Sequence, residues 1–122
     1  MRQFEIWWAT LPAPAGRRPV LLLSRNDAYQ YLGKFVVAEI TTTIRTIPVE
    51  VRLGSREGLP SPCVANLDNI RTAARQWFDS RAGTLAPSRH REVKRALGYA
   101  LGWDELIDLG AVPGDEHAGV QD

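Results

Sequence analysis

The apolar residues of this chain come in short runs, and segments rich in Gly and Pro separate those runs. This spacing is typical of β-strands, which bury alternate or continuous apolar side chains over about four to eight residues. Residues 48–53 (PVEVRL) alternate cleanly, whereas residues 18–24 (RPVLLLS) are almost continuously apolar. The clearest helical period lies in residues 87–102, where apolar positions recur three and four residues apart. The pattern predicts a mainly β (α+β) domain, a small, strongly bent sheet or barrel with a C-terminal α-helix packed on it.

Six strands and three helical segments follow from this pattern. Arg18–Ser24 lacks a polar face, so we expect both of its faces to be covered. Pro87 suits the first turn of the last helix, and Gly102 suits its C-cap. The expected strands are Gln3–Ala9, Arg18–Ser24, Lys34–Thr42, Pro48–Leu53, Cys63–Leu67 and Phe78–Leu85. The expected helical segments are Asn26–Leu32, Thr72–Trp77 and Pro87–Gly102.

Length and charge define the domain organisation. The 122 residues suffice for one domain with a modest core. Residues 1–102 hold all 15 basic residues and 8 acidic ones, whereas residues 103–122 hold 6 acidic residues and no Lys or Arg. A basic body indicates an anionic partner. We therefore assign one domain to residues 1–102 and expect an acidic, partly disordered C-terminal extension at residues 103–122.

Composition argues against several classes of site and location. The longest apolar run, Pro19–Leu23, is far too short to span a membrane, and no signal segment opens the chain, so we expect a cytoplasmic protein with no membrane partner. The single cysteine, Cys63, cannot form an internal disulfide, and its apolar surroundings favour a buried structural thiol. Because the acidic residues of the body are scattered and His90 and His117 stand apart, we expect no metal site, no cofactor and no two-histidine acid–base pair.

Arginines and hydroxyl groups gather at the ends of three predicted strands. Arg17 and Arg18 stand at the start of one strand, and residues 41–45 end another. At the end of a third, Arg71 and Thr72 follow Asn66, Asp68 and Asn69. A planar guanidinium binds phosphate oxygens through two parallel hydrogen bonds, and hydroxyl and amide groups add further contacts. If the fold brings these ends together, they form a polyanion site. The alternative is structural, because threonines fill strands, paired arginines often mark a solvated edge, and an excess of Arg can reflect codon usage.

Four segments resemble, in order and spacing, the MazF/PemK family of toxins. Gly16–Ser24 (GRRPVLLLS) resembles the family's G-x-RPVLV-x-S segment. Val36–Val51 resembles the apolar strand that runs into T-[ST]-T and then into a strand of the form Pro-hydrophobic-x-Val. Ser61–Thr72 resembles the DSVA-x-x-[DE]-Q-[IV]-RT segment, and Gly83–Gly102 resembles the family's last helix. The resemblance covers roughly residues 3–102 and is nearest in pattern to mycobacterial-type members.

The resemblance implies a compact SH3-like, CcdB-like barrel with a C-terminal helix, usually assembled as a homodimer. It implies the toxin component of a type II toxin–antitoxin system, an endoribonuclease that cuts single-stranded RNA at short sequence motifs without a metal ion. In the implied reaction the ribose 2′-hydroxyl attacks the adjacent phosphate and leaves a 2′,3′-cyclic phosphate and a free 5′-hydroxyl. The implied partners are single-stranded RNA (mRNA, with tRNA and rRNA as alternatives) and a MazE-like antitoxin.

The resemblance also implies site residues. Carried over position by position, the family's catalytic arginine is Arg18 and its catalytic threonine is Thr41. A fixed guanidinium can stabilise the charge that builds on phosphate oxygens, although an arginine that stays protonated is a poor base. The second-tier candidates for holding RNA are Arg17, Thr42, Thr43, Arg45, Asn69 and Arg71.

Tryptophans offer a second way to hold RNA. Trp7, Trp8 and Trp77 can stack on bases, an interaction worth about 1–3 kcal/mol per base in single-strand binders. For Trp8 we favour a place in the core, because the strand period puts it on one face with Phe4 and Ile6.

Two departures from the family pattern limit what carries over. The first loop is LPAPAG (Leu11–Gly16) instead of the longer, acidic GSEQ-like stretch of many members. Asn69 stands where the family usually has Gln, so the cleavage sequence cannot be transferred.

Two rival functions remain open at this stage. CcdB-like toxins share the barrel but poison DNA gyrase through a C-terminal segment that contains tryptophan, and Trp103 directly follows the last predicted helix. A non-catalytic homologue would bind RNA or an antitoxin without cleavage, but retention of both Arg18 and Thr41 argues against it. The RPV and TTT segments favour the nuclease over the gyrase poison.

Overall fold

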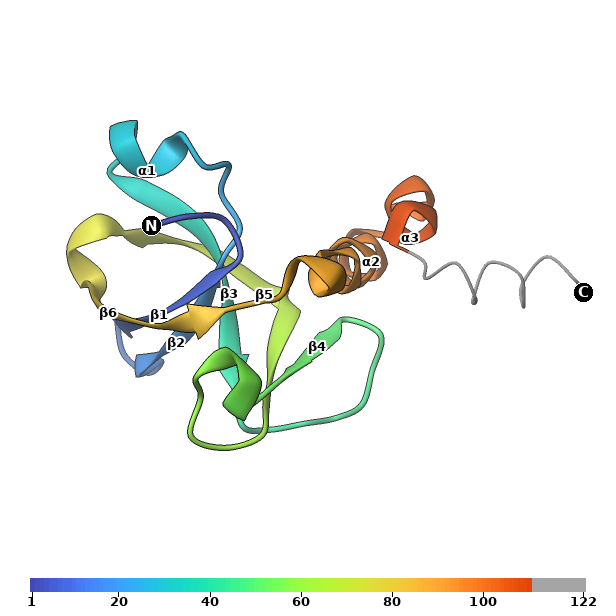
Figure 1. Ribbon diagram of the computed structural model, residues 1–122, viewed down its shortest axis with the longest axis horizontal. Coiled ribbons are helices and arrows are strands. Elements are labelled where there is room, and N and C mark those ends of the chain that lie inside the picture. Colours follow the sequence, from blue (N-terminus) through green and yellow to red (C-terminus); the bar gives the residue numbers. More distant parts are fainter. Residues whose placement is uncertain (111–122) are drawn as a thin grey trace, which may run out of the picture.

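The computed structural model describes residues 1–110, and its centre is a single antiparallel sheet (Figure 1). The sheet has six strands in the spatial order β4-β5-β3-β2-β1-β6, so β4 and β6 form its edges. The strands are β1 (Glu5–Leu11), β2 (Gly16–Leu22), β3 (Lys34–Thr41), β4 (Glu50–Leu53), β5 (Cys63–Ala74) and β6 (Phe78–Thr84).

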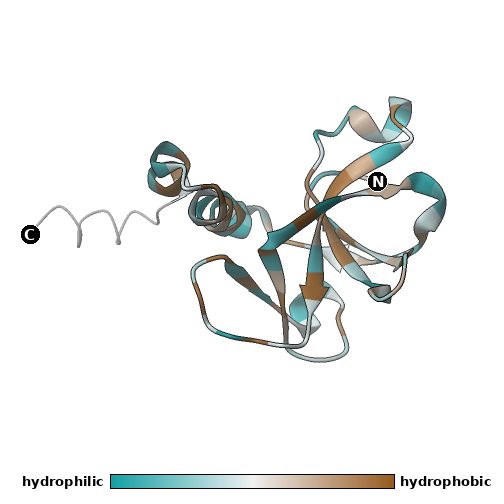
Figure 2. Cartoon of the chain, turned by 180° about the vertical axis from the view of Figure 1, so that it is seen from behind, coloured by the Kyte–Doolittle hydropathy of each residue, from teal (hydrophilic) through white to brown (hydrophobic). Residues whose placement is uncertain are grey.

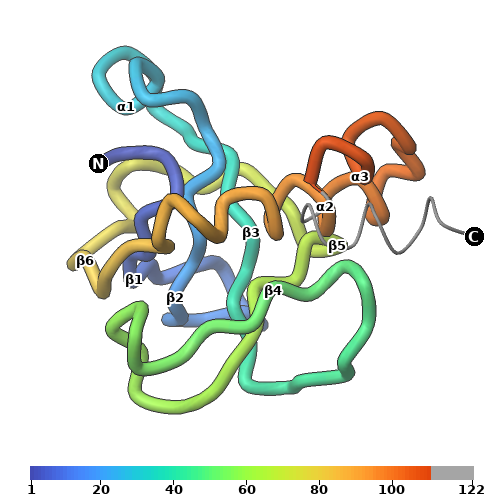
Figure 3. Tube along the Cα trace, turned by 45° about the vertical axis from the view of Figure 1, so that its right-hand side comes forward, coloured from blue at the N-terminus to red at the C-terminus, as the bar shows by residue number. Residues whose placement is uncertain are grey.

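Three α-helices and three short 3-10 turns complete the described part of the chain. The helices are α1 (Ala28–Tyr31), α2 (His90–Leu101) and α3 (Asp104–Gly110). The 3-10 turns are η1 (Ser55–Glu57), η2 (Arg75–Trp77) and η3 (Pro87–Arg89). Helix α2 packs against β4 and β5, and α3 packs on α2 at the side away from the sheet (Figure 3).

The sheet curls until the loop after β4 reaches the opposite edge strand, β6, and two glycines make this close approach possible. Gly58 follows η1 with φ of 83°, a left-handed conformation that favours glycine. A Cβ on Gly58 would overlap the carbonyl oxygen of Ala82, and a Cβ on Gly83 would overlap that of Glu57. The loop after the edge strand β4 therefore lies directly against the other edge strand, β6. The result is a curled half-barrel with a C-terminal helix, which confirms the predicted fold class.

Two hydrophobic clusters lie on the two faces of the sheet, and the strands carry most of the hydrophobic colour in Figure 2. Strand β2 contributes to both, because Leu21 enters one cluster while Val20 and Leu22 enter the other. This confirms that both faces of the apolar run are covered. Trp8 is only partly buried: it packs against the cluster that contains Ile6 and also lines a surface pocket, so the predicted core position is met in part.

Two elements differ from the sequence-based prediction. Strand β5 runs over Cys63–Ala74, so the predicted short strand is too short and the predicted helical turn is confined to Arg75–Trp77. Helix α3 was not predicted. It approaches α2 closely because Gly98 leaves room for Ile107, and Gly110 lies against the backbone of Arg91. The acidic extension thus begins as a packed helix, and residues 111–122 lie outside the described residues.

Cys63 and His90, which could have served as a nucleophile or an acid–base group, both pack in the interior or against it. Cys63 is 3% exposed, and burial raises the pKa of its thiol, as expected for a structural cysteine. His90 is half-buried rather than exposed, because its ring packs on Phe4 with 4.0 Å between ring centroids. Within residues 1–110 no helix is long and apolar enough to cross a membrane, and no cluster of three or more His, Cys, Asp or Glu could hold a metal ion.

Candidate functional site

A polar cavity of about 340 Å³ lies where β2 begins, β3 ends and β5 bends. It gathers groups from all three strand ends that the sequence analysis singled out. Guanidinium, hydroxyl and amide groups dominate its wall, with a single carboxylate. Its lining residues are Arg18, Thr41, Thr43, Arg45, Asn66, Asp68 and Asn69.

Strand register brings Arg18 and Thr41 together. Strands β2 and β3 are antiparallel, and Val20 pairs with Glu39. Continuing the same register by two residues on each strand places Arg18 beside Thr41. Directly opposed residues on antiparallel strands share one face of the sheet, with Cβ atoms about 5 Å apart. Both side chains line the cavity, in agreement with this placement.

An insertion in β5 supplies the amide wall of the cavity. Ala38 pairs with Ile70, whereas Ile40 pairs with Ala65, so residues 66–69 of β5 lie opposite Glu39 alone. Such bulges bend a strand and re-aim its side chains. The side-chain oxygen of Asn66, a residue only 8% exposed, accepts a hydrogen bond of 2.9 Å from the backbone N–H of Asp68. This hydrogen bond fixes the bend.

Arg18 is held in place by two acceptors. Its Nε donates to the carbonyl oxygen of Ala15 at 3.1 Å, and its Nη1 lies 3.3 Å from a carboxylate oxygen of Glu39. The second oxygen of Glu39 lies 3.4 Å from Nη1 of Arg71. The Glu39 side chain is 17% exposed, so one half-buried carboxylate orients two guanidinium groups.

Thr41 Oγ1 also has a defined role in the local backbone. It accepts a hydrogen bond of 3.1 Å from the backbone N–H of Thr43. A hydroxyl that accepts from the backbone keeps its own proton free to donate. Thr41 lines the same cavity as Arg18, so this donor is available at the cavity wall.

The chain matches the family model described as "PemK-like, MazF-like toxin of type II toxin-antitoxin system" over residues 2–101. The chain belongs to the PemK/MazF family. A Mycobacterium tuberculosis protein named "Probable endoribonuclease MazF2" is 39% identical over 103 residues, which cover 84% of this chain and 99% of that protein. The M. tuberculosis toxin MazF-mt6 superposes with a TM-score of 0.76 at 33% identity, covering 80% of this chain and 96% of that one. A mycobacterial endoribonuclease solved with its cognate antitoxin superposes with a TM-score of 0.73 at 29% identity, covering 84% and 95%.

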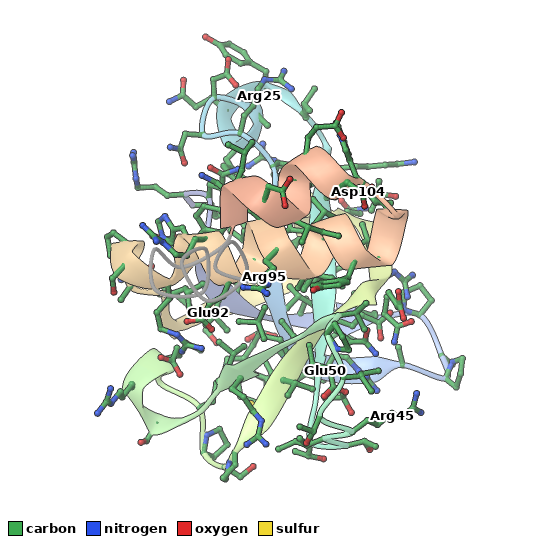
Figure 4. The ribbon with its side chains drawn as sticks, turned by 90° about the vertical axis from the view of Figure 1, so that its right-hand side faces the viewer. Arg25, Arg45, Glu50, Glu92, Arg95 and Asp104 are labelled. Carbon is green, nitrogen blue, oxygen red and sulfur yellow. The ribbon has the colours of Figure 1, made fainter. Side chains whose placement is uncertain are left out.

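Within this PemK/MazF fold, five of the eight sequence-predicted site residues line the same cavity. They are Arg18, Thr41, Thr43, Arg45 and Asn69. The guanidinium of Arg45 makes no ion pair with another residue of the range 1–110, although its backbone N–H donates to Glu50 (Figure 4).

The other three predicted residues lie elsewhere. Arg17 points to the opposite face of β2, where it forms an ion pair of 2.9 Å with Asp79 and lies 4.6 Å above the Trp8 ring. The hydrogen bond from Arg17 holds the pKa of the Asp79 carboxyl below its usual value. Thr42 lines an apolar pocket that adjoins the cavity at Thr41, and Arg71 stays on the cavity's face of the sheet but is engaged by Glu39.

Three residues in or near the cavity are not among the site residues implied by the family resemblance. Asn66 and Asp68 belong to one of the strand ends expected to form a polyanion site, and the bulge places them on the cavity wall. Asp68 is the one carboxylate on its wall and makes no ion pair within residues 1–110. Glu39 did carry a signal, because it is the only charged residue inside the apolar run VVAEI and stands two positions before Thr41, on the same strand face.

Proposed function

We propose that this PemK/MazF-family chain cleaves single-stranded RNA in the Arg18–Thr41 cavity without a metal ion. The observation that carries the proposal is that Arg18 and Thr41 line one polar cavity. The MazF relatives are named endoribonucleases, which supports the same activity here.

In the proposed reaction the cavity binds the phosphate that is to be attacked. The ribose 2′-oxygen forms a bond to phosphorus while the bond from phosphorus to the 5′-oxygen breaks. Arg18 donates two hydrogen bonds to the non-bridging oxygens, whose negative charge grows in the transition state, and Thr41 Oγ1 adds one donor. Asp68 supplies the one carboxyl group on the cavity wall, and we assign it the role of accepting the 2′-hydroxyl proton. The leaving 5′-oxygen takes a proton from solvent.

The test is an RNA cleavage assay in EDTA followed by mapping of the new ends. Purified protein and a mixed-sequence single-stranded RNA are expected to give cuts at a short motif, with 2′,3′-cyclic phosphate and 5′-hydroxyl ends. Ends with a 5′-phosphate, or cleavage that needs a divalent cation, would contradict the proposed chemistry. A parallel gyrase supercoiling assay tests the CcdB-like alternative, for which RNA would stay intact while supercoiling stops.

Glu39 is expected to act as a positioning residue for Arg18. Glu39→Gln keeps the shape of the side chain but removes the charge that orients two guanidinium groups, so we expect kcat to fall about tenfold, equivalent to roughly 1.4 kcal/mol. KM is expected to stay level or fall, because the change removes a negative charge near the RNA phosphate. Steady-state kinetics on an RNA with a single cleavage site separate the two constants.

Asp79→Asn is the matched control for that substitution. It removes the carboxylate that pairs with Arg17 on the other face of the sheet. We expect its kcat to match that of the wild-type protein. An equal decrease in both variants, or none in Glu39→Gln, would show that Glu39 does not position the site.

We also propose a cognate antitoxin, a homodimer and a cytoplasmic location for this chain. A structural relative was solved with its cognate antitoxin. The basic body of residues 1–102 suits an acidic antitoxin segment that competes with RNA by charge and shape. Because RNA substrates occur in the cytoplasm, the proposed activity requires that location.

A further inference from the structure

Arginines without ion pairs extend beyond the catalytic cavity. Arg52 and Arg56 are exposed and, like Arg45, form no ion pair within residues 1–110. By contrast, Arg17 and Arg71 are engaged by Asp79 and Glu39. A guanidinium that pairs with a carboxylate has fewer N–H donors left for phosphate, whereas an unpaired guanidinium keeps all five. Three arginines without an ion pair within residues 1–110 thus lie on the segment from Arg45 to Arg56.

Arg52 and Arg56 line a hollow of their own. It has a volume of about 410 Å³ and lies around β4, η1 and the loop that leads to β5. It offers guanidinium and hydroxyl groups beside proline rings. Its lining residues are Arg52, Leu53, Gly54, Ser55, Arg56, Glu57, Leu59, Pro60, Ser61, Pro62 and Arg89. We call it the Arg52–Arg56 cavity.

Strand register relates this cavity to the proposed catalytic residues. Val64 of β5 pairs with Thr41 on one side and with Arg52 on the other. Paired residues share a face, so Thr41 and Arg52 lie in one row on the same face of the sheet. They are separated by two strand spacings, or about 10 Å between Cα atoms. A flexible sugar–phosphate backbone readily bridges such a distance.

An apolar pocket joins the two cavities. Thr41 lines both this pocket and the catalytic cavity, and residues 59–61 line both the pocket and the Arg52–Arg56 cavity. Trp8 and Pro19 line its wall, and the Arg17 guanidinium lies 4.6 Å from the centre of the Trp8 ring. The order of surfaces is thus polar, apolar and basic, which matches the alternation of phosphate and base along single-stranded RNA.

We propose that the RNA strand continues from the catalytic cavity, past the apolar pocket, to Arg52 and Arg56, which bind a phosphate flanking the cleavage site. This inference rests on the proposed RNA cleavage. Base pairing would keep the bases stacked away from the apolar pocket, so the path fits a single strand with exposed base faces. The competing explanation is that the arginines only protect the edge strand β4 from pairing with another chain.

The test is the salt dependence of RNA binding. The probe is a single-stranded RNA that spans the mapped motif and carries a 2′-deoxyribose at the cleavage position, so that it binds without being cut. For Arg52→Ala/Arg56→Ala we expect the slope of log K against log salt to become shallower by about 0.7 for each phosphate that the variant no longer neutralises. Arg52→Lys/Arg56→Lys is expected to keep most of the slope because it keeps the charge.

The matched control is Arg25→Ala/Lys34→Ala, which removes two positive charges that flank α1. Arg25 and the arginine Arg45 lie at opposite ends of the molecule (Figure 4). We expect the wild-type slope for this control. Shortening the RNA probe from one of its two ends is expected to weaken binding to the wild-type protein. The same shortening is expected to leave binding to the Arg52→Ala/Arg56→Ala variant unchanged.

Three results would overturn the inference. The first is an unchanged slope for Arg52→Ala/Arg56→Ala, and the second is an equal change in the control variant. The third is a change in oligomeric state instead of RNA binding, which would mean that a second copy covers the arginines. If the wild-type protein binds the RNA probe with the expected slope yet cuts no RNA, the proposed cleavage fails while this binding path stands.

Discussion

Replacing Arg18 by alanine is expected to lower RNA cleavage about 10²–10³-fold, the usual cost of removing one donor aimed at developing transition-state charge. A large effect is expected because two acceptors hold the Arg18 guanidinium in the cavity that Thr41 also lines. The decrease is expected mainly in kcat, since Arg45 still attracts the RNA. Single-turnover cleavage of an RNA with one site measures the effect.

Arg17→Ala is the control for this prediction, because the two arginines are neighbours in the chain but point to opposite faces of β2. We expect Arg17→Ala to change cleavage less than about threefold, as its guanidinium is an exposed partner of Asp79. Arg18→Lys should recover little activity, because an ammonium cannot donate two parallel hydrogen bonds. If Arg17→Ala proved as damaging as Arg18→Ala, the catalytic cavity would be wrongly placed.

The contrast between these two arginines shows what the sequence could predict about the site. The strand period requires Arg17 and Arg18 to point to opposite faces, but it does not say which face carries the cavity. The resemblance to the PemK/MazF family selected Arg18 and Thr41. The register between β2 and β3, which depends on pairing between distant segments, then placed them together. The engagement of Arg71 by Glu39 depends on the same long-range pairing.

The missed features of the fold have the same physical origin. The bulge at residues 66–69 follows from how β5 pairs with β3, so local propensity predicted a strand that ended too early. Helix α3 occupies a segment whose glycine and acidic residues are typical of a solvated tail. Its position depends on Gly98, because the absence of a side chain there leaves space on α2 for Ile107. Helix α2 was predicted well because the spacing of its apolar residues, three and four positions apart, can be seen within the segment itself.

Replacing Arg89 by alanine is expected to destabilise the fold by about 2–4 kcal/mol, because it leaves a buried carboxylate without its cation. Glu57 is 5% exposed, and one of its oxygens lies 3.3 Å from Arg89 Nη1 while the other accepts the Gly54 N–H at 2.7 Å. Arg89 also pairs with Glu92 at 2.7 Å and donates to the carbonyl oxygen of Arg52. One side chain thus ties the start of α2 to η1 and β4.

Urea unfolding at one fixed protein concentration measures the free energy of unfolding, since self-association would otherwise shift the midpoint. Arg25→Ala is the matched control. It breaks an ion pair with Asp27 in which both side chains are mostly exposed, and such pairs contribute about 0–1 kcal/mol. Adding Glu57→Gln to Arg89→Ala should restore part of the stability, because the neutral amide still accepts from Gly54 and leaves no unpaired charge. If the double variant is no more stable than Arg89→Ala, the unpaired Glu57 carboxylate is not the cause. The destabilisation then comes from the missing interactions of Arg89 with Glu92 and β4.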